Sequence, residues 1–183
     1  MKKIGIFMAD GCEEIEGLTV VDVLRRAGVE IQMISINGKK QVEGSHKITF
    51  LTDMDVSEMN PEEFDGVVLP GGLPGTYNLR DDERVQKIIG EFKEEGKLIA
   101  AICAAPSVFG EAGLLEGKKA TCHPGFEDKL LGAEWMEEPV VVDGNVITSR
   151  AMGTATNFAL EILAYGKGKE AAQEMRKSLL YKG

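Results

Sequence analysis

The chain has 183 residues, of which 43% are hydrophobic and 28% charged, proportions typical of a soluble globular domain. Its net charge is −9, from 21 basic and 30 acidic residues, and no cluster of lysine and arginine offsets this excess. The charge argues against nucleic acid and anionic membrane surfaces as partners, and the length predicts a single domain over residues 1–183.

Taken in chain order, the predicted elements of the first half are a buried strand over Lys3–Met8, a helix with an apolar face from Leu18 to Ala27, a strand over Val29–Ile36, and a hairpin strand over His46–Asp53. Gly28 ends the helix, and the Asn37-Gly38 turn closes the second strand. Apolar periodicity thus switches from strand to helix and back, which indicates an α/β arrangement.

The second half continues this alternation, with predicted elements at Asp65–Gly72 (a strand running into a glycine-rich loop), Asp81–Glu95 (helix), Leu98–Ile102 (strand), Ala104–Gly110 (helix), Lys119–Cys122 (short strand), Pro139–Thr148 (hairpin), Gly153–Tyr165 (helix) and Lys169–Leu180 (helix). Short apolar strands that alternate with amphipathic helices predict an α/β sandwich with a mainly parallel sheet. No repeat or linker divides the chain.

The N-terminus and the cysteines indicate a cellular setting. The apolar stretch Ile4–Ala9 is too short for a signal-peptide core, and no run of the sequence is long enough to span a bilayer, so a cytoplasmic location is expected. The three cysteines are odd in number, far apart and without a C-x-x-C pair: Cys12, Cys103 and Cys122. This pattern predicts free thiols in a reducing compartment and not a disulfide framework. With only two histidines, no structural zinc site is expected.

Three loops follow predicted parallel strands: "ADGCEEIEG" after Met8, "LPGGLPGTYN" after Val68, and "ICAAPS" from Ile102. Ligands bind beyond the carboxyl ends of such strands, so these loops are expected to meet. Together they would bring carboxylates, backbone amides and a thiol to one place.

Cys103 has two interpretations, a small core residue at a strand end or a nucleophile at a strand-to-helix turn. Gly71-Gly72 is either a simple glycine turn or a source of a backbone N–H that binds an oxyanion. The segment around it matches neither of the phosphate-binding patterns G-x-x-x-x-G-K-[ST] and G-x-G-x-x-G. Glu16 lies between apolar residues, so a buried carboxyl with a raised pKa is predicted, able to donate a hydrogen bond to a thiolate.

The other candidates are weaker by themselves. Glu13 and Glu14 are typical of a helix N-terminus, where carboxylates are favourable. His123 is either an ordinary loop residue or, beside Cys103, a base or proton carrier. Cys12 is either a bystander or a resolving thiol for oxidised Cys103.

Taken together, these segments resemble the ThiJ/PfpI superfamily, and within it the DJ-one-like branch of parkinsonism-associated deglycase relatives. The resemblance covers essentially the whole chain and is carried by six segments in order: "GCEEIE" (Gly11–Glu16), "VVDVLRRAG" (Val20–Gly28), "DGVVLPGG" (Asp65–Gly72), "IAAICAAP" (Ile99–Pro106), "ATCHPG" (Ala120–Gly125) and "TSRAMGTATNFAL" (Thr148–Leu160).

The resemblance implies a flavodoxin-like three-layer sandwich that forms a homodimer and needs no metal or organic cofactor. It implies a readily oxidised nucleophile at Cys103, a protonated Glu16 touching its sulfur, and oxyanion donors on the backbones of Gly72 and Ala104. It places His123 near the thiol without a tight catalytic triad.

The function expected from the resemblance is cysteine-dependent chemistry on small reactive carbonyls or glycated substrates, of the glutathione-independent glyoxalase or deglycase type. The alternative is a redox-sensing stress protein or chaperone that is switched by oxidation of Cys103. A peptidase is less expected, because the protease-like branch carries a histidine where this chain has Ala104. His46 stands where relatives carry an arginine near the dimer interface.

Overall fold

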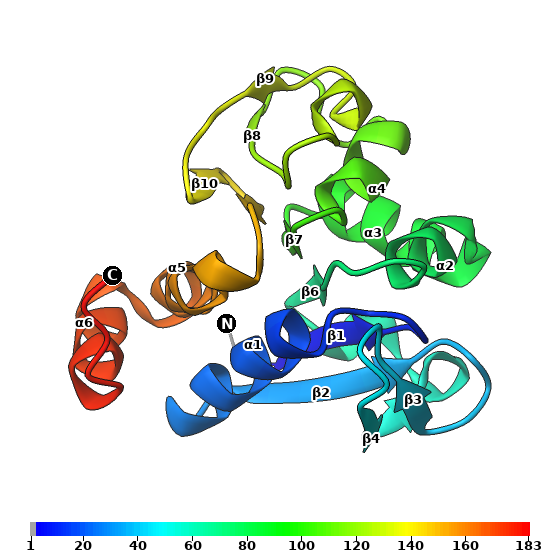
Figure 1. Cartoon of the computed structure of the whole chain (residues 1–183), viewed down its shortest axis with the longest axis horizontal. Coiled ribbons are helices and arrows are strands. Elements are labelled where there is room, and N and C mark those ends of the chain that lie inside the picture. The colour runs from blue at the N-terminus through cyan, green and yellow to red at the C-terminus, as the bar shows by residue number, and fades with distance from the viewer. Residues whose placement is uncertain (1–2) are drawn as a thin grey trace.

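The computed structural model describes residues 3–183, and its centre is a seven-stranded sheet with the order β10-β11-β7-β6-β1-β2-β5 (Figure 1). Its strands are β1 (Lys3–Met8), β2 (Glu30–Ser35), β5 (Met54–Asp55), β6 (Gly66–Leu69), β7 (Leu98–Ile102), β10 (Val140–Asp143) and β11 (Val146–Ser149). Neighbouring strands pair in parallel except β10 with β11, which form an antiparallel hairpin at one edge. The predicted mainly parallel sheet is confirmed.

The central strands are apolar on both sides because both faces of the sheet are covered. In β7, Leu98, Ala100 and Ile102 face one apolar core, whereas Ile99 and Ala101 face the other. All five residues are completely buried. A continuous apolar run such as this is typical of a parallel strand covered on both sides.

Helices complete the three predicted layers. On one face lie α1 (Glu14–Arg26) and α5 (Ala155–Lys167), with α6 (Lys169–Ser178) packed against α5; the other face carries α2 (Gly75–Asp81), α3 (Glu83–Glu94) and α4 (Pro106–Glu111) (Figure 1). The chain therefore folds as one α/β sandwich. Within residues 3–183, no helix combines the length and apolar character needed to cross a bilayer.

Two small sheets lie outside the main one. A hairpin joins β3 (Gln41–Glu43) to β4 (Thr49–Leu51), and β8 (Lys119–Ala120) pairs in parallel with β9 (Glu134–Trp135). The strand predicted over His46–Asp53 is thus shorter, since residues 44–48 form the turn. The strand predicted over Lys119–Cys122 stops at Ala120, after which the chain turns toward β7 and His123 N donates to Cys103 O.

Two helix starts differ from the sequence prediction for local reasons. The helix predicted from Asp81 begins at Glu83, because the Asp82 side chain caps it by accepting from Arg84 N and Val85 N. The helix predicted from Ala104 begins at Pro106, whose ring suits the first helical turn. Helix α2 and the two-residue edge strand β5 have too little periodicity to be predicted.

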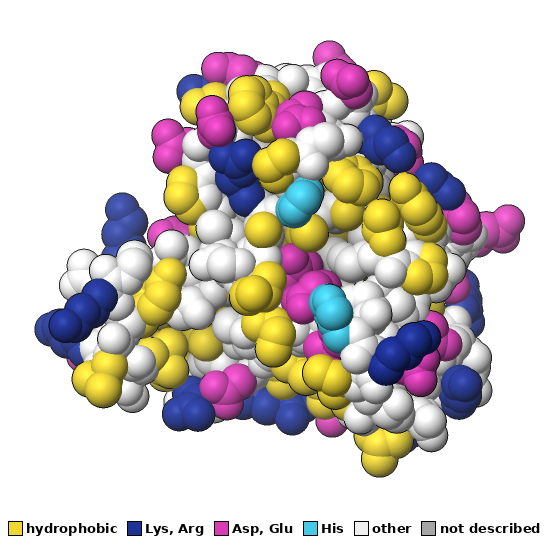
Figure 2. All heavy atoms as spheres, in the orientation of Figure 1, with side chains coloured by type: hydrophobic (Ala, Val, Ile, Leu, Met, Phe, Trp, Pro, Cys, Tyr) yellow, Lys and Arg dark blue, Asp and Glu magenta, His cyan; other side chains and the backbone are white. Residues whose placement is uncertain are grey.

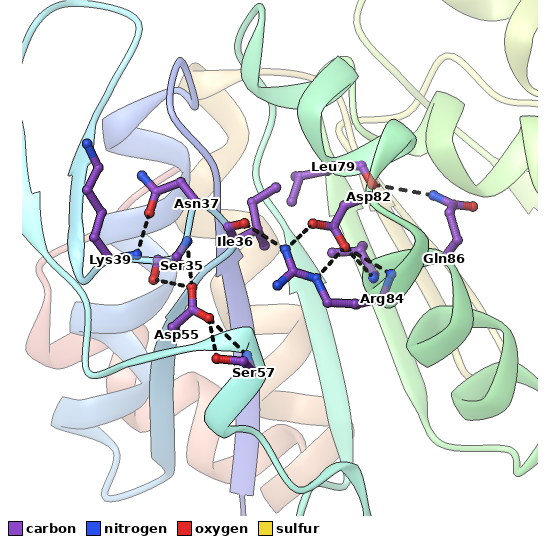
Figure 3. Close-up of polar contacts among 12 residues, drawn as sticks. Ser35, Ile36, Asn37, Lys39, Asp55, Ser57, Leu79, Asp82, Arg84 and Gln86 are labelled. Carbon is purple, nitrogen blue, oxygen red and sulfur yellow. Dashed lines mark hydrogen bonds and ion pairs between the residues drawn. The ribbon is translucent and has the colours of Figure 1, made fainter.

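A polar network joins the carboxyl end of β2 to β5 and α3 (Figure 3). Arg84 donates to the carbonyl of Ile36 at 2.8 Å and also pairs with Asp82. Asp55 accepts from Gly38 N at 3.0 Å and from both the amide and hydroxyl of Ser57. These bonds hold the edge of the sheet, away from the loops that follow β6 and β7.

Candidate functional site

The three strand-end loops meet at the carboxyl ends of β1, β6 and β7, where β6 lies between the other two strands. Glu13 N donates to Gly71 O at 2.8 Å, so the first loop is bonded to the second. Glu16 then bridges the second and third loops, since it accepts from Gly71 N and forms a hydrogen bond with Cys103. The predicted convergence of carboxylate, amides and thiol is therefore present.

Cys103 follows β7 directly and has φ = 65°, in the left-handed region that residues with a side chain rarely adopt. Two backbone bonds hold this turn, from Cys103 N to Ser149 O at 2.9 Å and from His123 N to Cys103 O at 2.8 Å. The side chain is half-buried. A strained turn that presents a thiol at a strand end has the geometry of a nucleophile elbow.

Glu16 lies in the first turn of α1 and is 1% exposed. Its Oε2 accepts from Gly71 N at 2.9 Å, and its carboxylate also accepts from the amide of Met152. Burial, assisted by the negative charge of Glu13, raises the pKa of Glu16 to about 7, although the hydrogen bonds from Cys103, Gly71 and Met152 oppose the shift. Near neutral pH both the protonated and the ionised form of this carboxyl are therefore populated.

The Cys103 thiol contacts the carboxyl of Glu16 and two backbone amides. The backbones of Gly72 and Ala104 form hydrogen bonds with the thiol that lower its pKa. Burial and the negative charge of Glu16 outweigh them and raise the pKa of Cys103 to about 12. The charge of Glu16 acts on the thiol only while that carboxyl is ionised, so the predicted thiolate beside a protonated Glu16 stays a prediction.

Glycine is required at both positions of the Gly71-Gly72 turn. A Cβ on Gly71 would lie 2.6 Å from both Cys103 Cβ and Glu16 Oε2. Gly72 has φ = 86°, and a Cβ there would overlap the backbone of Glu13. The missing side chains let the backbone approach the thiol, so this segment is both a glycine turn and a source of N–H donors near sulfur.

His123 is close to the nucleophile through its backbone rather than its ring. Its amide donates to Cys103 O, whereas its Nδ1 lies 2.9 Å from Pro124 O and the side chain is exposed. Among the described residues, no hydrogen bond joins the His123 ring to Cys103 or Glu16. A role for His123 in moving protons stays a prediction.

The other two cysteines are completely buried. Burial raises the pKa of Cys12 to about 12, with a further contribution from the charges of Glu14 and Glu13. The backbone of Cys12 packs against Gly72 and Gly75, so this residue supports the site wall. Its role as a redox partner stays a prediction, and burial of its thiol favours the bystander interpretation. Cys122 belongs to the core on the α3 and α4 face.

Glu14 has a role that its sequence position does not indicate. Although it lies at a helix N-terminus as expected, it is 1% exposed and accepts from His46 N at 2.7 Å, from Ile48 N at 3.5 Å and from His46 Nδ1 at 2.9 Å. Glu13, Glu14 and His46 present metal-ligand-type atoms within 4.8 Å of one another. These atoms already pair with each other, which attaches the β3–β4 turn to α1.

Two further contacts of Glu16, from the amides of Gly71 and Met152, were not predicted from the sequence. Backbone donors carry no residue-type signal, so only the folded chain reveals them. On the face drawn in Figure 2, acidic and histidine side chains lie near the centre and hydrophobic side chains surround them. Met152 and Ile15, which are 53% and 47% exposed, are among the large hydrophobic residues at the surface.

Comparison with known proteins identifies relatives of the chain. The chain is 40% identical over 177 residues to protein dj-1beta of Drosophila melanogaster (96% of this chain, 95% of that protein) and 35% identical over 153 residues to a deglycase of Pyrococcus abyssi (82% and 91%). It spans only 41% of the length of DJ-1 homolog B of Arabidopsis thaliana, to which it is 39% identical over 181 residues, or 98% of this chain.

A solved structure described as oxidized Toxoplasma gondii DJ-1 superposes on the chain with a TM-score of 0.96 and 34% identity, covering 100% of both chains. The family model described as DJ-1/PfpI family matches residues 2–165, which include every residue of the site described above. From this match and the relatives above, the chain belongs to the DJ-1/PfpI family.

Proposed function

We propose that the chain is a cysteine-dependent enzyme that converts a small 2-oxoaldehyde, such as methylglyoxal, into a 2-hydroxy acid. The observation that carries the proposal is a thiol on a strained turn that contacts a buried carboxyl with a pKa of about 7 and two backbone amides. Similarity to a deglycase supports the same class of carbonyl substrate, including glycated groups.

In the first step Cys103 passes its thiol proton to the Glu16 carboxylate, with which it forms a hydrogen bond, and its sulfur attacks the aldehyde carbon. This forms a C–S bond and places the π electron pair of the C=O bond on oxygen. The amides of Gly72 and Ala104, which contact the sulfur in the free protein, are positioned to stabilise this oxyanion. Protonation of the oxyanion gives a hemithioacetal.

Proton transfer then oxidises the former aldehyde carbon to the thioester level and reduces the former ketone carbon to an alcohol. A base removes the C–H proton of the former aldehyde carbon to give an ene-diol, and a proton returns to the former ketone carbon, which leaves a thioester. With a pKa of about 7, Glu16 is suited to both steps, and His123 is the second candidate. Water hydrolyses the thioester to the 2-hydroxy acid and free thiol, so no external oxidant or cofactor is consumed.

The test is to incubate the purified chain with methylglyoxal and to measure formation of the 2-hydroxy acid by NMR. We expect steady product formation, its loss in Cys103→Ser, and its retention in Cys122→Ala, which changes a buried cysteine outside the site. Absence of product from the wild type, or equal rates for wild type and Cys103→Ser, would contradict the proposal.

A second candidate function is redox sensing or a chaperone role switched by oxidation of Cys103. One observation favours it: Cys103 is half-buried whereas Cys12 and Cys122 are fully buried, so oxidant reaches one thiol selectively. A similar protein is also described as oxidized. Mild peroxide should then add two oxygen atoms to the intact mass, located on Cys103; an unchanged mass with reduced Cys103 would exclude this function.

We also propose that the chain acts as a homodimer. Ile15, Ile48 and Leu51 are large apolar side chains that are 47%, 51% and 67% exposed. Ile15 adjoins Glu14, which bonds to the amide of Ile48, so these two residues lie on neighbouring segments near the site. Covering apolar surface with a second copy would be favourable.

A further inference from the structure

A cavity of about 460 Å³ lies beside the loops of the site and takes no part in the proposed reaction. Three segments form it: the loop after β1, the β3–β4 hairpin with the residues before it, and the start of α2. Backbone bonds join them, from Gly11 N to Glu43 O at 2.8 Å and from Gly75 N to Gly11 O at 3.1 Å. The cavity has the size of a small-molecule site, and bonds within the chain hold its walls.

Two charged side chains line this cavity without a charged partner, Asp10 and Lys39. A third, Lys47, pairs with Glu43 at 3.0 Å, but within residues 3–183 no ion pair engages Asp10 or Lys39. The Asp10 carboxylate accepts only from neutral groups, Asn37 Nδ2 at 2.9 Å and Glu43 N at 3.0 Å. The cavity therefore offers one unpaired charge of each sign.

Asn37 keeps these two charged residues close together. Its Nδ2 donates to Asp10 Oδ2, and its Oδ1 accepts from Lys39 N at 3.2 Å. Asn78 Nδ2, from α2, donates to the carbonyl of Asp10 at 2.8 Å and fixes the same loop. Figure 3 shows the Lys39 side chain extending away from the polar network around Asp55, so its ammonium is available to a ligand.

The cavity also adjoins the catalytic thiol, through Gly72. The backbone of Gly72 forms a hydrogen bond with Cys103, and a Cβ on Gly72 would lie 2.8 Å from the carbonyl oxygen of Gly11 in the cavity wall. The next residue, Leu73, lines the cavity and is 45% exposed. Consecutive Cα atoms are about 3.8 Å apart, so a ligand in the cavity needs to extend past only this one side chain to approach Cys103.

We propose that this cavity binds the α-ammonium and α-carboxylate groups of a free amino acid whose side chain carries the carbonyl adduct. Asp10 accepts from the ammonium, Lys39 donates to the carboxylate, and Leu73 contacts the side chain that leads to Cys103. A zwitterion matches one unpaired charge of each sign, whereas a simple anion or cation leaves one of them unmatched. The inference deepens the proposed function and rests on it, since the adduct is the glycated group that the thiol processes.

The chemistry balances without a further reactant. The adduct of a thiol side chain with a 2-oxoaldehyde is a hemithioacetal. Its C–S bond breaks with the electron pair going to sulfur, its hydroxyl proton passes to that sulfur, and the aldehyde re-forms. Cys103 attacks this aldehyde as in the proposed reaction, and the amino acid leaves with its thiol restored. Binding of the amino-acid part thus holds the carbonyl next to the nucleophile.

The probe for this site is S-(2-oxopropyl)-L-cysteine, a stable thioether that carries both α groups and a ketone but cannot release an aldehyde. Its affinity is measured by isothermal titration calorimetry for the wild type and for Cys103→Ser, which cannot form a bond to substrate carbon through sulfur. We expect both proteins to bind it. The methyl ester and the N-acetyl derivative of the probe each lack one charge and should bind about fivefold more weakly.

Two variants assign the charges to their residues. Lys39→Met should weaken binding of the free acid about fivefold and leave the methyl ester unchanged. Asp10→Asn keeps an oxygen for Glu43 N and should weaken the free amine but not the N-acetyl derivative. Lys177→Met, at an exposed lysine of α6, is the matched control and should bind every probe as the wild type does.

No binding to the wild type, equal affinity for the free and blocked probes, or an equal loss of acid and ester in Lys39→Met would overturn the inference. The bound probe should also slow alkylation of Cys103 by iodoacetamide, and an unchanged rate at saturation would contradict the link between cavity and thiol. Turnover of methylglyoxal without probe binding refutes this inference alone. Probe binding without turnover refutes the proposed function alone.

Discussion

Glu16 links the chemistry of the site to the stability of the chain. Its pKa is about 7 in the folded protein against an ordinary value of 4.5, chiefly because it is buried. Between these two pH values the folded chain holds a proton that the unfolded chain has released. The free energy of unfolding therefore falls as pH rises from 4.5 to 7, and the full penalty, about 3 kcal/mol, is present above pH 7.

We predict that Glu16→Gln removes this dependence. Relative to the wild type, the variant should gain up to about 3 kcal/mol in free energy of unfolding between pH 4.5 and pH 8. Urea denaturation at a series of pH values measures the difference. Glu62→Gln, at an exposed glutamate, serves as the control and should run parallel to the wild type. An equal difference between Glu16→Gln and the wild type at both ends of the range would show that Glu16 does not retain its proton.

At the scale of elements, the site depends on a hairpin that is distant from it in sequence. The β3–β4 turn is attached to the start of α1 by Glu14, and Ser45 N donates to Cys12 O at 2.8 Å. Burial opposes ionisation of Glu14, but hydrogen bonds from the His46 side chain and from nearby amides lower its pKa below the ordinary value. Gly44 is required here, since a Cβ would overlap the Glu14 carboxylate.

We predict that Glu14→Ala destabilises the chain by about 2 kcal/mol, because it leaves the amides of His46 and Ile48 without their acceptor. Hydrogen exchange of residues 44–48 should accelerate at the same time, as mass spectrometry would detect. Lys47→Ala is the control at the same turn; it removes only the exposed pair with Glu43 and should cost less than about 0.5 kcal/mol. Equal protection of the turn in both variants would refute this role of Glu14.

At the scale of the whole molecule, large apolar side chains are exposed near the site. The net charge of −9 disfavours indiscriminate association, so a dimer must gain its stability from specific apolar contact. Ile15 lies between Glu14 and Glu16 on α1, Ile48 lies in the turn that is bonded to Glu14, and Leu51 is exposed on β4. An interface there would lie beside the thiol.

We predict that the wild type sediments as a dimer and that Ile15→Glu combined with Ile48→Glu sediments as a monomer, because two buried like-charged pairs would be introduced by symmetry. Sedimentation velocity at moderate salt measures both. Leu180→Glu, at an 84% exposed residue near the C-terminus, should remain dimeric. A monomeric wild type, or a double variant that remains dimeric, would contradict an interface at this surface.

Most of the fold could be predicted because its signals are local. The apolar runs of β1, β6 and β7 and the amphipathic pattern of α3 follow directly from residue order. Weak elements were missed for the same reason: β5 has two residues, and its place at the sheet edge depends on Asp55 and on pairing with β2. Helix α3 begins two residues after its predicted start because Asp82 caps it.

The sequence by itself determined the order of the elements, the three loops that meet, and the identity of the thiol and carboxyl they bring together, since strand ends and residue types can be read along one chain. Only the tertiary structure decided which backbone groups contact that pair. The pKa of Glu16 depends on burial and on amides from Gly71 and Met152, which lie 55 and 136 positions away along the chain. Solvent exclusion and backbone donors act through space and leave no residue pattern, which is why these contacts of Glu16 are revealed only by the folded chain.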